Sequence, residues 1–138
     1  MGTTTKKSVL VVEDSAVDCR FLVSAIKAAA NDVNVQTAPD GVAAMAFFGG
    51  ESAPDLVVTD LRMPNMDGFD LLQRLKSRPE TSTVPVVVVS NSTDPDDIRQ
   101  SYERHAAGYL AKPDTPVGYQ RLGEDFARFW FNQVLLPN

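Results

Sequence analysis

The sequence is short of the residues that build disulfide frameworks and cysteine-based active sites. It contains one cysteine, Cys19, and one histidine, His105, among 138 residues. A single cysteine cannot form an internal disulfide, and only His105 could act as the base of a catalytic thiol. Cys19 lies within a helical pattern, so we interpret it as a reduced structural thiol. We interpret His105 as a surface residue near a helix end.

The sequence also lacks a long hydrophobic run and an excess of positive charge. The polar start, MGTTTKKS, precedes no long apolar stretch, which argues against a signal peptide and a membrane span and predicts a cytoplasmic protein. The net charge is −5 at pH 7. Because binding to a nucleic-acid backbone depends on a basic surface, we expect neither nucleic acid nor a membrane as a partner.

What remains is the composition of an ordinary folded domain. Hydrophobic residues make up 43% of the chain and charged residues 22%, and a chain of this length has the usual size of one domain. We find no internal repeat, low-complexity tract or interdomain linker. The sequence therefore predicts a single domain over residues 1–138, with a short polar tail at 1–7 and a C-terminal aromatic helix and tail at 117–138.

Short runs of β-branched and apolar residues alternate with helical patterns along the chain. Most of these runs are apolar on successive residues, which is typical of strands buried on both faces. The predicted strands are residues 8–12, 33–37, 55–59, 85–90 and 108–111. The predicted helices are residues 17–29, 41–48, 71–75, 95–106 and a fifth from about 117.

This alternation predicts a doubly wound α/β fold. Right-handed crossovers place helices on both faces of a parallel sheet. Five successive βα units then give a five-stranded parallel sheet of the flavodoxin-like type, with the strand order 2-1-3-4-5.

Polar side chains follow the strands at the carboxyl edge of this predicted sheet. They are Glu13 and Asp14 after the first strand, Asp60 at the end of the third, Ser90 at the end of the fourth and Lys112 after the fifth. Open α/β sheets bind ligands outside the carboxyl ends of their strands, so these side chains can meet in one hollow. Neighbouring strand residues point to opposite faces, so Glu13 and Asp14 can share the hollow only if the chain bends there.

The charges in this hollow point to a metal ion and a phosphoryl group. Three carboxylates repel one another by roughly 4 kcal/mol per pair at 4 Å and an effective dielectric constant near 20, and Lys112 supplies only one positive charge. Mg²⁺ accepts a few carboxylates and keeps several waters. Mg²⁺ and a lysine commonly stabilise a transferring phosphoryl group, and a carboxylate can accept that group covalently. We therefore predict that Asp60 becomes an aspartyl phosphate.

Four motifs, taken together, resemble a known family. VVEDS, VVTDLRMPNMDG, VVVVSNS and GYLAKP occur in this order and strongly resemble the receiver domain of two-component response regulators from Val9 to about Phe131. The resemblance implies that a sensor histidine kinase phosphorylates Asp60. It also implies that the protein is not an enzyme on a separate substrate but phosphorylates and dephosphorylates itself with Mg²⁺, and that a cis peptide precedes Pro113.

The same resemblance implies roles for individual residues. The implied Mg²⁺ ligands are Glu13, Asp14, Asp60 and the backbone carbonyl of Arg62. Ser90 and Lys112 are implied to stabilise the phosphoryl group, and Ser90 and Tyr109 to act as the switch residues that reorient on activation.

A finer resemblance lies in the last third of the chain. SYERHAAGYLAKP followed by FARFWFNQVLLP resembles the single-domain regulators that partner bacterial phytochrome histidine kinases, which makes such a kinase one candidate donor. The signal is expected to reach an unidentified downstream protein through the face formed by the fourth helix, fifth strand and fifth helix. Arg62 and Asn91 depart from commoner patterns of the family, which bears on the phosphoryl lifetime and not on the chemistry.

Three alternative functions were weighed against the phosphorylation switch. A Mg²⁺-dependent phosphohydrolase usually has a second acid two residues after its aspartate, where this chain has Arg62. A flavin carrier shares the strand order, but EDSAVDC lacks a hydroxyl- and glycine-rich phosphate loop. A degenerate receiver acting as a protein scaffold stays open as the alternative, although Asp60, Asp14 and Lys112 are intact.

Several residues near the hollow also have structural interpretations. Glu13 and Asp14 can partly cap the helix that starts near Ser15. Gly68 is expected to shape its loop with a positive φ. Arg62 is most simply a solvated residue at the rim.

The aromatic C-terminus predicts a homodimer. From about residue 117, four residues at helical spacing form a stripe suited to the core: Tyr119, Leu122, Phe126 and Phe129. Trp130 and Phe131 lie off this stripe, because consecutive helix residues are about 100° apart. Left exposed with Val134 and Leu135, they would form an apolar patch unusual for a monomer. We predict a dimer interface of these four residues, which the phytochrome-partner resemblance favours, since such regulators often pair through this region; the alternative is a tail folded back onto its own domain.

Overall fold

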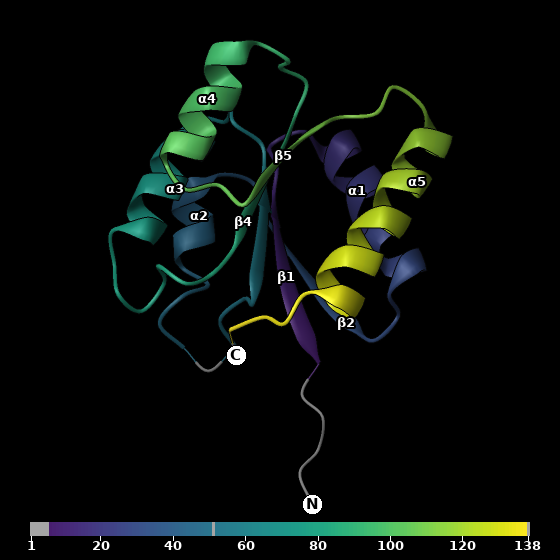
Figure 1. The fold of residues 1–138 in the computed structure, drawn as a ribbon, viewed down its shortest axis with the longest axis horizontal. Coiled ribbons are helices and arrows are strands. Elements are labelled where there is room, and N and C mark those ends of the chain that lie inside the picture. The colour runs from purple at the N-terminus through teal and green to yellow at the C-terminus, as the bar shows by residue number, and fades with distance from the viewer. Residues whose placement is uncertain (1–5, 51, 138) are drawn as a thin grey trace, which may run out of the picture.

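The computed structural model describes residues 6–50 and 52–137, and five parallel strands form one sheet between two layers of helices (Figure 1). The strands are β1 (Lys7–Val12), β2 (Val33–Ala38), β3 (Leu56–Thr59), β4 (Val86–Ser90) and β5 (Gly108–Ala111). Their order is β2-β1-β3-β4-β5, which confirms the predicted fold. Most of the predicted N-terminal tail, residues 1–5, lies outside the described residues, and Lys7 already begins β1.

Helices cover both faces of the sheet (Figure 1). On one face lie α1 (Ala16–Ala29) and α5 (Pro116–Ala127), and on the other lie α2 (Gly41–Met45), α3 (Gly68–Lys76) and α4 (Pro95–Glu103). No helix in the described part of the chain is both apolar enough and long enough to span a bilayer.

Two apolar cores lie on the two faces of the sheet, and the strands contribute to both. Leu10 and Val12 of β1 belong to the core beneath α2 and α3, whereas Val9 and Val11 belong to the core beneath α1 and α5. Successive strand residues point to opposite faces. A strand with helices packed on both faces of its sheet must therefore be apolar at every position. This explains why the strands read as continuous apolar runs.

Two helices end earlier than their sequence patterns predicted, for local backbone reasons. After α2, Ala46, Phe47 and Phe48 bond to carbonyls three residues back, which is a tighter turn than the α-helix. After α4, His105 adopts φ 70°, and the N–H groups of His105 and Ala106 bond to Tyr102 and Ser101, respectively. This is the Schellman pattern that terminates helices, so His105 has the helix-end position expected of it.

The aromatic C-terminus departs from the α-helix. Residues Arg128–Gln133 form a π-helix, in which Val134 N–H bonds to the Phe129 carbonyl, five residues back. More residues per turn rotate each following side chain backwards relative to an α-helix. The prediction that Phe129 belongs to the core is therefore wrong, and it is 54% exposed. Trp130 and Phe131 instead turn toward Phe126, with ring centroids 6.4 and 5.9 Å away.

Close packing of α1 on α5 depends on Gly123, and this generates a prediction about stability. A Cβ at Gly123 would lie 2.6 Å from the Ala25 carbonyl oxygen and 2.7 Å from its Cβ. We expect Gly123→Val to lower the free energy of unfolding by about 2 kcal/mol, because the two helices must separate. Urea denaturation measures this. Gly108→Val is the matched control, since space is open there and a strand favours valine; an equal loss in both variants would contradict the packing argument.

Candidate functional site

A cavity of about 470 Å³ lies at the carboxyl edge of the sheet. The five polar side chains predicted to meet there all line it: Glu13, Asp14, Asp60, Ser90 and Lys112. Arg62 lines it as well. The structure therefore brings these residues together, while their roles toward a metal or a phosphoryl group stay predictions.

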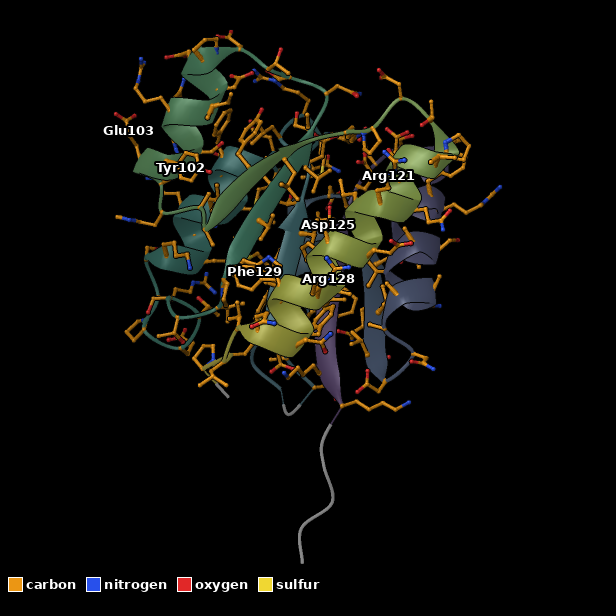
Figure 2. All side chains as sticks on the ribbon, turned by 45° about the vertical axis from the view of Figure 1, so that its right-hand side comes forward. Tyr102, Glu103, Arg121, Asp125, Arg128 and Phe129 are labelled. Atoms are coloured by element: carbon orange, nitrogen blue, oxygen red, sulfur yellow. The ribbon has the colours of Figure 1, made fainter. Side chains whose placement is uncertain are left out.

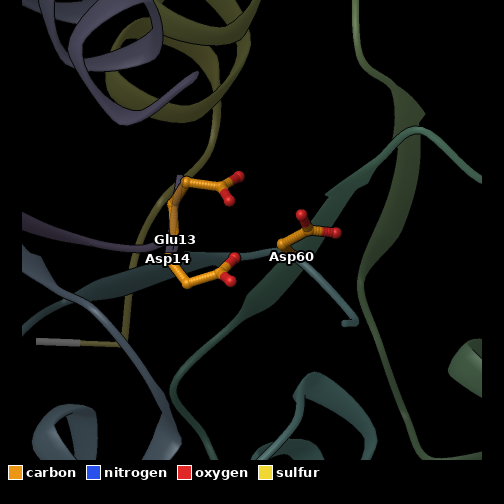
Figure 3. Close-up of side chains that lie close together, drawn as sticks. All are labelled: Glu13, Asp14 and Asp60. Carbon is orange, nitrogen blue, oxygen red and sulfur yellow. The ribbon is translucent and has the colours of Figure 1, made fainter. Parts of the chain in front are cut away.

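Three carboxylates form a cluster in this cavity. Ligand oxygens of Glu13, Asp14 and Asp60 lie within 4.8 Å of one another (Figure 3). The chain bends at Asp14 directly after β1, which allows two consecutive acids to share one site. Carboxylate oxygens at this spacing are the donors that Mg²⁺ prefers, so the residues present fit the predicted ion.

Lys112 is the positive charge among these acids. Its Nζ lies 2.7 Å from Glu13 Oε1, 2.8 Å from Asp18 Oδ2 and 2.8 Å from Asp60 Oδ2. A lysine ammonium has three N–H donors, so each has a carboxylate partner. Burial lowers the pKa of Lys112, but hydrogen bonds to Asp18, Asp60 and Glu13 outweigh burial and hold the pKa above its usual value. Lys112 is therefore a fixed cation.

The carboxylate of Glu13 is harder to ionise than that of an ordinary glutamate. Burial, helped by the charge of Asp60, raises the pKa of Glu13 to about 7, against the lowering effect of hydrogen bonds from Lys112 and the Ser15 N–H. The carboxylate is held in place, since its Oε2 accepts the Ser15 N–H at 3.1 Å. The acid thus helps to fix the start of α1, as expected. Burial is the main cause of this raised pKa, and a cation bound beside Glu13 would favour its ionised form.

Asp60 directly follows β3 and is 8% exposed. Its Oδ1 accepts the Leu61 N–H at 2.6 Å and its Oδ2 accepts from Lys112. Gly68 lies against it: a Cβ there would be 2.2 Å from the Asp60 carbonyl oxygen. The prediction of a positive φ at Gly68 is wrong, since Gly49 is the only glycine with positive φ among the described residues. Gly68 is needed for close approach to the backbone of Asp60.

The loop after β4 connects the cavity to Tyr109. Ser90 Oγ accepts the Ser92 N–H at 3.1 Å, and the Tyr109 hydroxyl donates to the Ser92 carbonyl at 2.8 Å. Tyr109 does not line the cavity but is held by the same loop. The predicted cis peptide before Pro113 is not found, because all peptide bonds of the described residues are trans; trans is intrinsically favoured by about 0.5–1 kcal/mol at X–Pro bonds.

Arg62 is more than the solvated rim residue predicted from the sequence. Its Nη2 donates to both carboxylate oxygens of Asp97 on α4, at 2.9 and 3.0 Å. Its guanidinium lies 5.6 Å from the Phe69 ring centroid, and that of Arg104 lies 5.2 Å from the same ring. The side chain is 66% exposed, yet it joins the loop after Asp60 to α4.

Asp97 links this ion pair back to the β4–α4 loop. It accepts a hydrogen bond from Ser92 Oγ at 2.6 Å. That hydroxyl, and then the Arg62 guanidinium, hold the pKa of Asp97 below its usual value. Residues on three segments, after β3, after β4 and on α4, therefore form one polar network beside the cavity.

Sequence analysis missed Asp18, which lines the cavity and bonds to Lys112. It lies in the first turn of α1, four residues after Asp14. That spacing keeps it at the carboxyl edge of the sheet and was the available signal, although an acid in the first turn of a helix is ordinarily explained by the helix dipole.

Comparison with known proteins agrees with this geometry. Residues 9–120 match the response regulator receiver domain family. The chain is 34% identical over 137 residues to the response regulator Rcp1 of Synechocystis sp., which covers 95% of this chain and 93% of Rcp1. Its structure is similar to that of the phosphorylated cyanobacterial phytochrome response regulator RcpA, with TM-score 0.88, 34% identity and coverage of 96% of this chain and 99% of RcpA.

A second solved relative bears on the metal. The Mn²⁺-bound form of Rcp1 has TM-score 0.86 and 35% identity, over 96% of this chain and 99% of that structure. The family predicted from the four motifs is therefore confirmed. This chain belongs to the response regulator receiver domain family and is similar over nearly its whole length to the phytochrome response regulators Rcp1 and RcpA.

Proposed function

We propose that this protein is a phosphorylation switch in which Asp60 accepts a phosphoryl group from a sensor histidine kinase. The observation that supports this proposal most directly is the set of groups around the Asp60 carboxylate. One of its carboxylate oxygens accepts from Lys112 and the other from a backbone N–H, and two further carboxylates lie within 4.8 Å. The relative RcpA, solved in a phosphorylated form, supports the same chemistry.

The reaction is a direct transfer to a carboxylate. An ionised oxygen of Asp60 attacks phosphorus, and a P–O bond forms as the P–N bond to the donor histidine breaks and its imidazole leaves with the electron pair. Lys112 supplies a buried positive charge beside the new phosphoryl oxygens, and the Ser90 hydroxyl at the end of β4 is available to donate to them. Mg²⁺, held by Glu13, Asp14, Asp60 and the Arg62 carbonyl, would neutralise further phosphoryl charge.

The β4–α4 loop is the proposed relay to the surface. In the unphosphorylated structure Ser90 Oγ holds the Ser92 N–H, while Ser92 holds Tyr109 and Asp97 through its carbonyl and hydroxyl. A Ser90 hydroxyl turned to the phosphoryl group gives up the first of these bonds. We propose that this shifts an existing equilibrium of the loop, and with it Tyr109 and α4, toward a second arrangement.

The proposed donor surface lies on α1, whose first turn contributes Asp18 to the cavity. Val17 and Phe21 of α1 are 58% and 39% exposed, and Phe21 stacks on Tyr119 of α5 at 5.4 Å. An apolar strip beside an acidic cavity suits the docking of a kinase helix that presents a phosphohistidine. The likeness to Rcp1 and RcpA makes a phytochrome kinase the candidate donor. The downstream protein stays unidentified.

The first functional prediction concerns the acceptor. Incubation with a small phosphodonor and Mg²⁺ should add one phosphoryl group to the wild type and none to Asp60→Asn, because the amide is not a nucleophile of this kind. Intact-protein mass spectrometry measures the mass gain. Equal labelling of both proteins would refute the assignment. A wild type that stays unlabelled, while it and Asp60→Asn bind the same partner equally, would favour the phosphorylation-independent scaffold.

The second prediction concerns the metal. Glu13, Asp14 and Asp60 repel one another without a cation, so Mg²⁺ should raise the melting temperature by mass action. At 100 times Kd, binding adds about 2.7 kcal/mol to the free energy of unfolding. Asp14→Asn should weaken this response, and Asp70→Asn, an exposed acid on α3, should not. A melting temperature that is constant across millimolar Mg²⁺ would count against a metal site.

We also propose that the C-terminal segment forms a two-fold homodimer. The π-helix leaves Phe129 54% exposed, and Leu135 beyond it is 95% exposed. Trp130, Phe131 and Val134 are half-buried against their own domain, so in the proposed interface they contribute part of their surface and Leu135 contributes its whole side chain. Phe129 shares the outer face of α5 and the π-helix with charged residues (Figure 2), which fits an apolar centre with a polar rim.

A groove next to this segment has the size and lining to receive an apolar side chain. It measures about 470 Å³ and is lined by residues of β5, α5 and the π-helix, among them Leu110, Leu122, Phe126 and Trp130. In a two-fold arrangement each subunit can place Leu135 toward the groove of the other, because an isologous interface uses the same patch twice.

The dimer proposal is tested by substituting residues that are exposed in the single chain, because such substitutions do not disturb its core. Light scattering should show a wild-type dimer and a monomeric Phe129→Glu/Leu135→Lys variant, with the far-ultraviolet circular dichroism unchanged. Val42→Glu, an equally exposed apolar residue on α2, should remain dimeric. A wild type that is monomeric at high micromolar concentration, phosphorylated or not, would contradict the proposal.

A further inference from the structure

We infer that Asp18 is a positioning residue for the phosphorylation reaction, which it serves by holding Lys112; the inference rests on the proposed function of Asp60. Asp18 Oδ2 accepts from Lys112 Nζ at 2.8 Å, across 94 residues of sequence. The lysine side chain is 5% exposed and that of Asp18 is 30% exposed. The contact is therefore a charge-assisted hydrogen bond largely shielded from water, which is stronger than a surface ion pair.

No hydrogen bond from its own helix, all of which the structure describes, holds the Asp18 carboxylate. Asp18 occupies the third position of α1, and its N–H donates to Ser15 Oγ at the N-cap, at 3.2 Å. An acid at this position commonly reaches back to the N-cap N–H in a capping box. Here that N–H is taken by Glu13 Oε2, and the Asp18 carboxylate extends to Lys112 instead. Asp18 is thus bonded to the site and not to its own helix.

The other two partners of Lys112 cannot fix it throughout the reaction. Glu13 and Asp60 both belong to the carboxylate cluster that fits a metal ion, and Asp60 is also the proposed acceptor. Their oxygens acquire new partners when a cation or a phosphoryl group arrives. Asp18 lies outside that cluster, so its bond to Lys112 can persist. A lysine ammonium on a flexible four-carbon stem needs such a fixed partner to stay aimed at one point.

Two effects of removing the Asp18 charge have opposite signs and can be separated. Loss of one negative charge reduces the repulsion of an anionic donor, which lowers the donor concentration needed for half-saturation. Loss of the bond lets Lys112 drift from the position of the transferring group, which lowers the maximal rate. Positioning therefore predicts a fall in the maximal rate even where the donor binds more readily.

The experiment measures phosphorylation of Asp60 by acetyl phosphate over a range of concentrations at saturating Mg²⁺. We expect Asp18→Asn to lower the maximal rate roughly tenfold, the size expected for one lost bond to a charged group. Asp70→Asn is the matched control, because Asp70 has the same helix position in α3, with its N–H also bonded to the N-cap side chain. Asp70→Asn should behave as wild type.

A double-mutant cycle tests whether Asp18 acts through Lys112. In a Lys112→Ala background, Asp18→Asn should have no further effect on the maximal rate. An equal effect in both backgrounds, an unchanged rate or a faster rate in Asp18→Asn would each overturn the inference. If Lys112→Ala is too slow to follow, the same cycle is measured as affinity for beryllofluoride, which mimics the phosphoryl group on Asp60.

The outcomes also separate this inference from the proposed function. Absence of labelling in the wild type would overturn the role of Asp60 itself, whereas normal labelling of the wild type and Asp18→Asn alike overturns only the role of Asp18. If Asp18→Asn fails to fold, the same rate measurement is made on Asp18→Glu. It keeps the charge but displaces the carboxylate by one methylene, so the maximal rate should fall while the half-saturating concentration does not.

Discussion

The contact of one buried ammonium with three carboxylates is the interaction on which the rest of this structure depends. Lys112 follows β5. Of its partners, Glu13 follows β1, Asp18 lies in the first turn of α1 and Asp60 follows β3. These segments meet only because the strands are parallel and β1 lies inside the sheet next to β3. Without the lysine, the acids at this edge would repel one another by several kcal/mol at such distances. The arrangement of charges at this edge therefore depends on the strand order of the sheet.

That contact places three carboxylates around one ammonium, and in the proposed switch this excess of negative charge would favour the binding of a cation. Burial also raises the pKa of Glu13, so its ionised form gains from a nearby positive charge. A cation and then a phosphoryl group can change the local charge without the fold being rebuilt. In the proposed switch, the neighbouring polar network would pass such a change to the surface, because Ser92 bonds to Ser90, Tyr109 and Asp97 together. A site whose acids were all paired with positive charges would have less tendency to bind a cation.

The parts of the site that the sequence predicted are those fixed by local rules. Asp60 and Ser90 were found because strand ends are visible as the ends of apolar runs, and parallel strands end at one edge. The bonds Arg62–Asp97 and Asp18–Lys112 were not, because side-chain partners 35 and 94 residues apart leave no local pattern. Gly68 shows the same limit, since its glycine is required by a neighbouring backbone and not by its own φ.

The C-terminal segment shows how a single change of helix type redistributes apolar surface. A continued α-helix would have kept Phe129 in the core stripe and left Trp130 and Phe131 beyond it. The π-helix instead turns Trp130 and Phe131 toward Phe126 and leaves Phe129 facing outward. Its end is tied to the sheet, because Lys7 Nζ at the start of β1 donates to the Phe131 carbonyl at 3.2 Å. This bond anchors the π-helix at the start of β1, and an anchored apolar patch costs less to order on association than a free tail would.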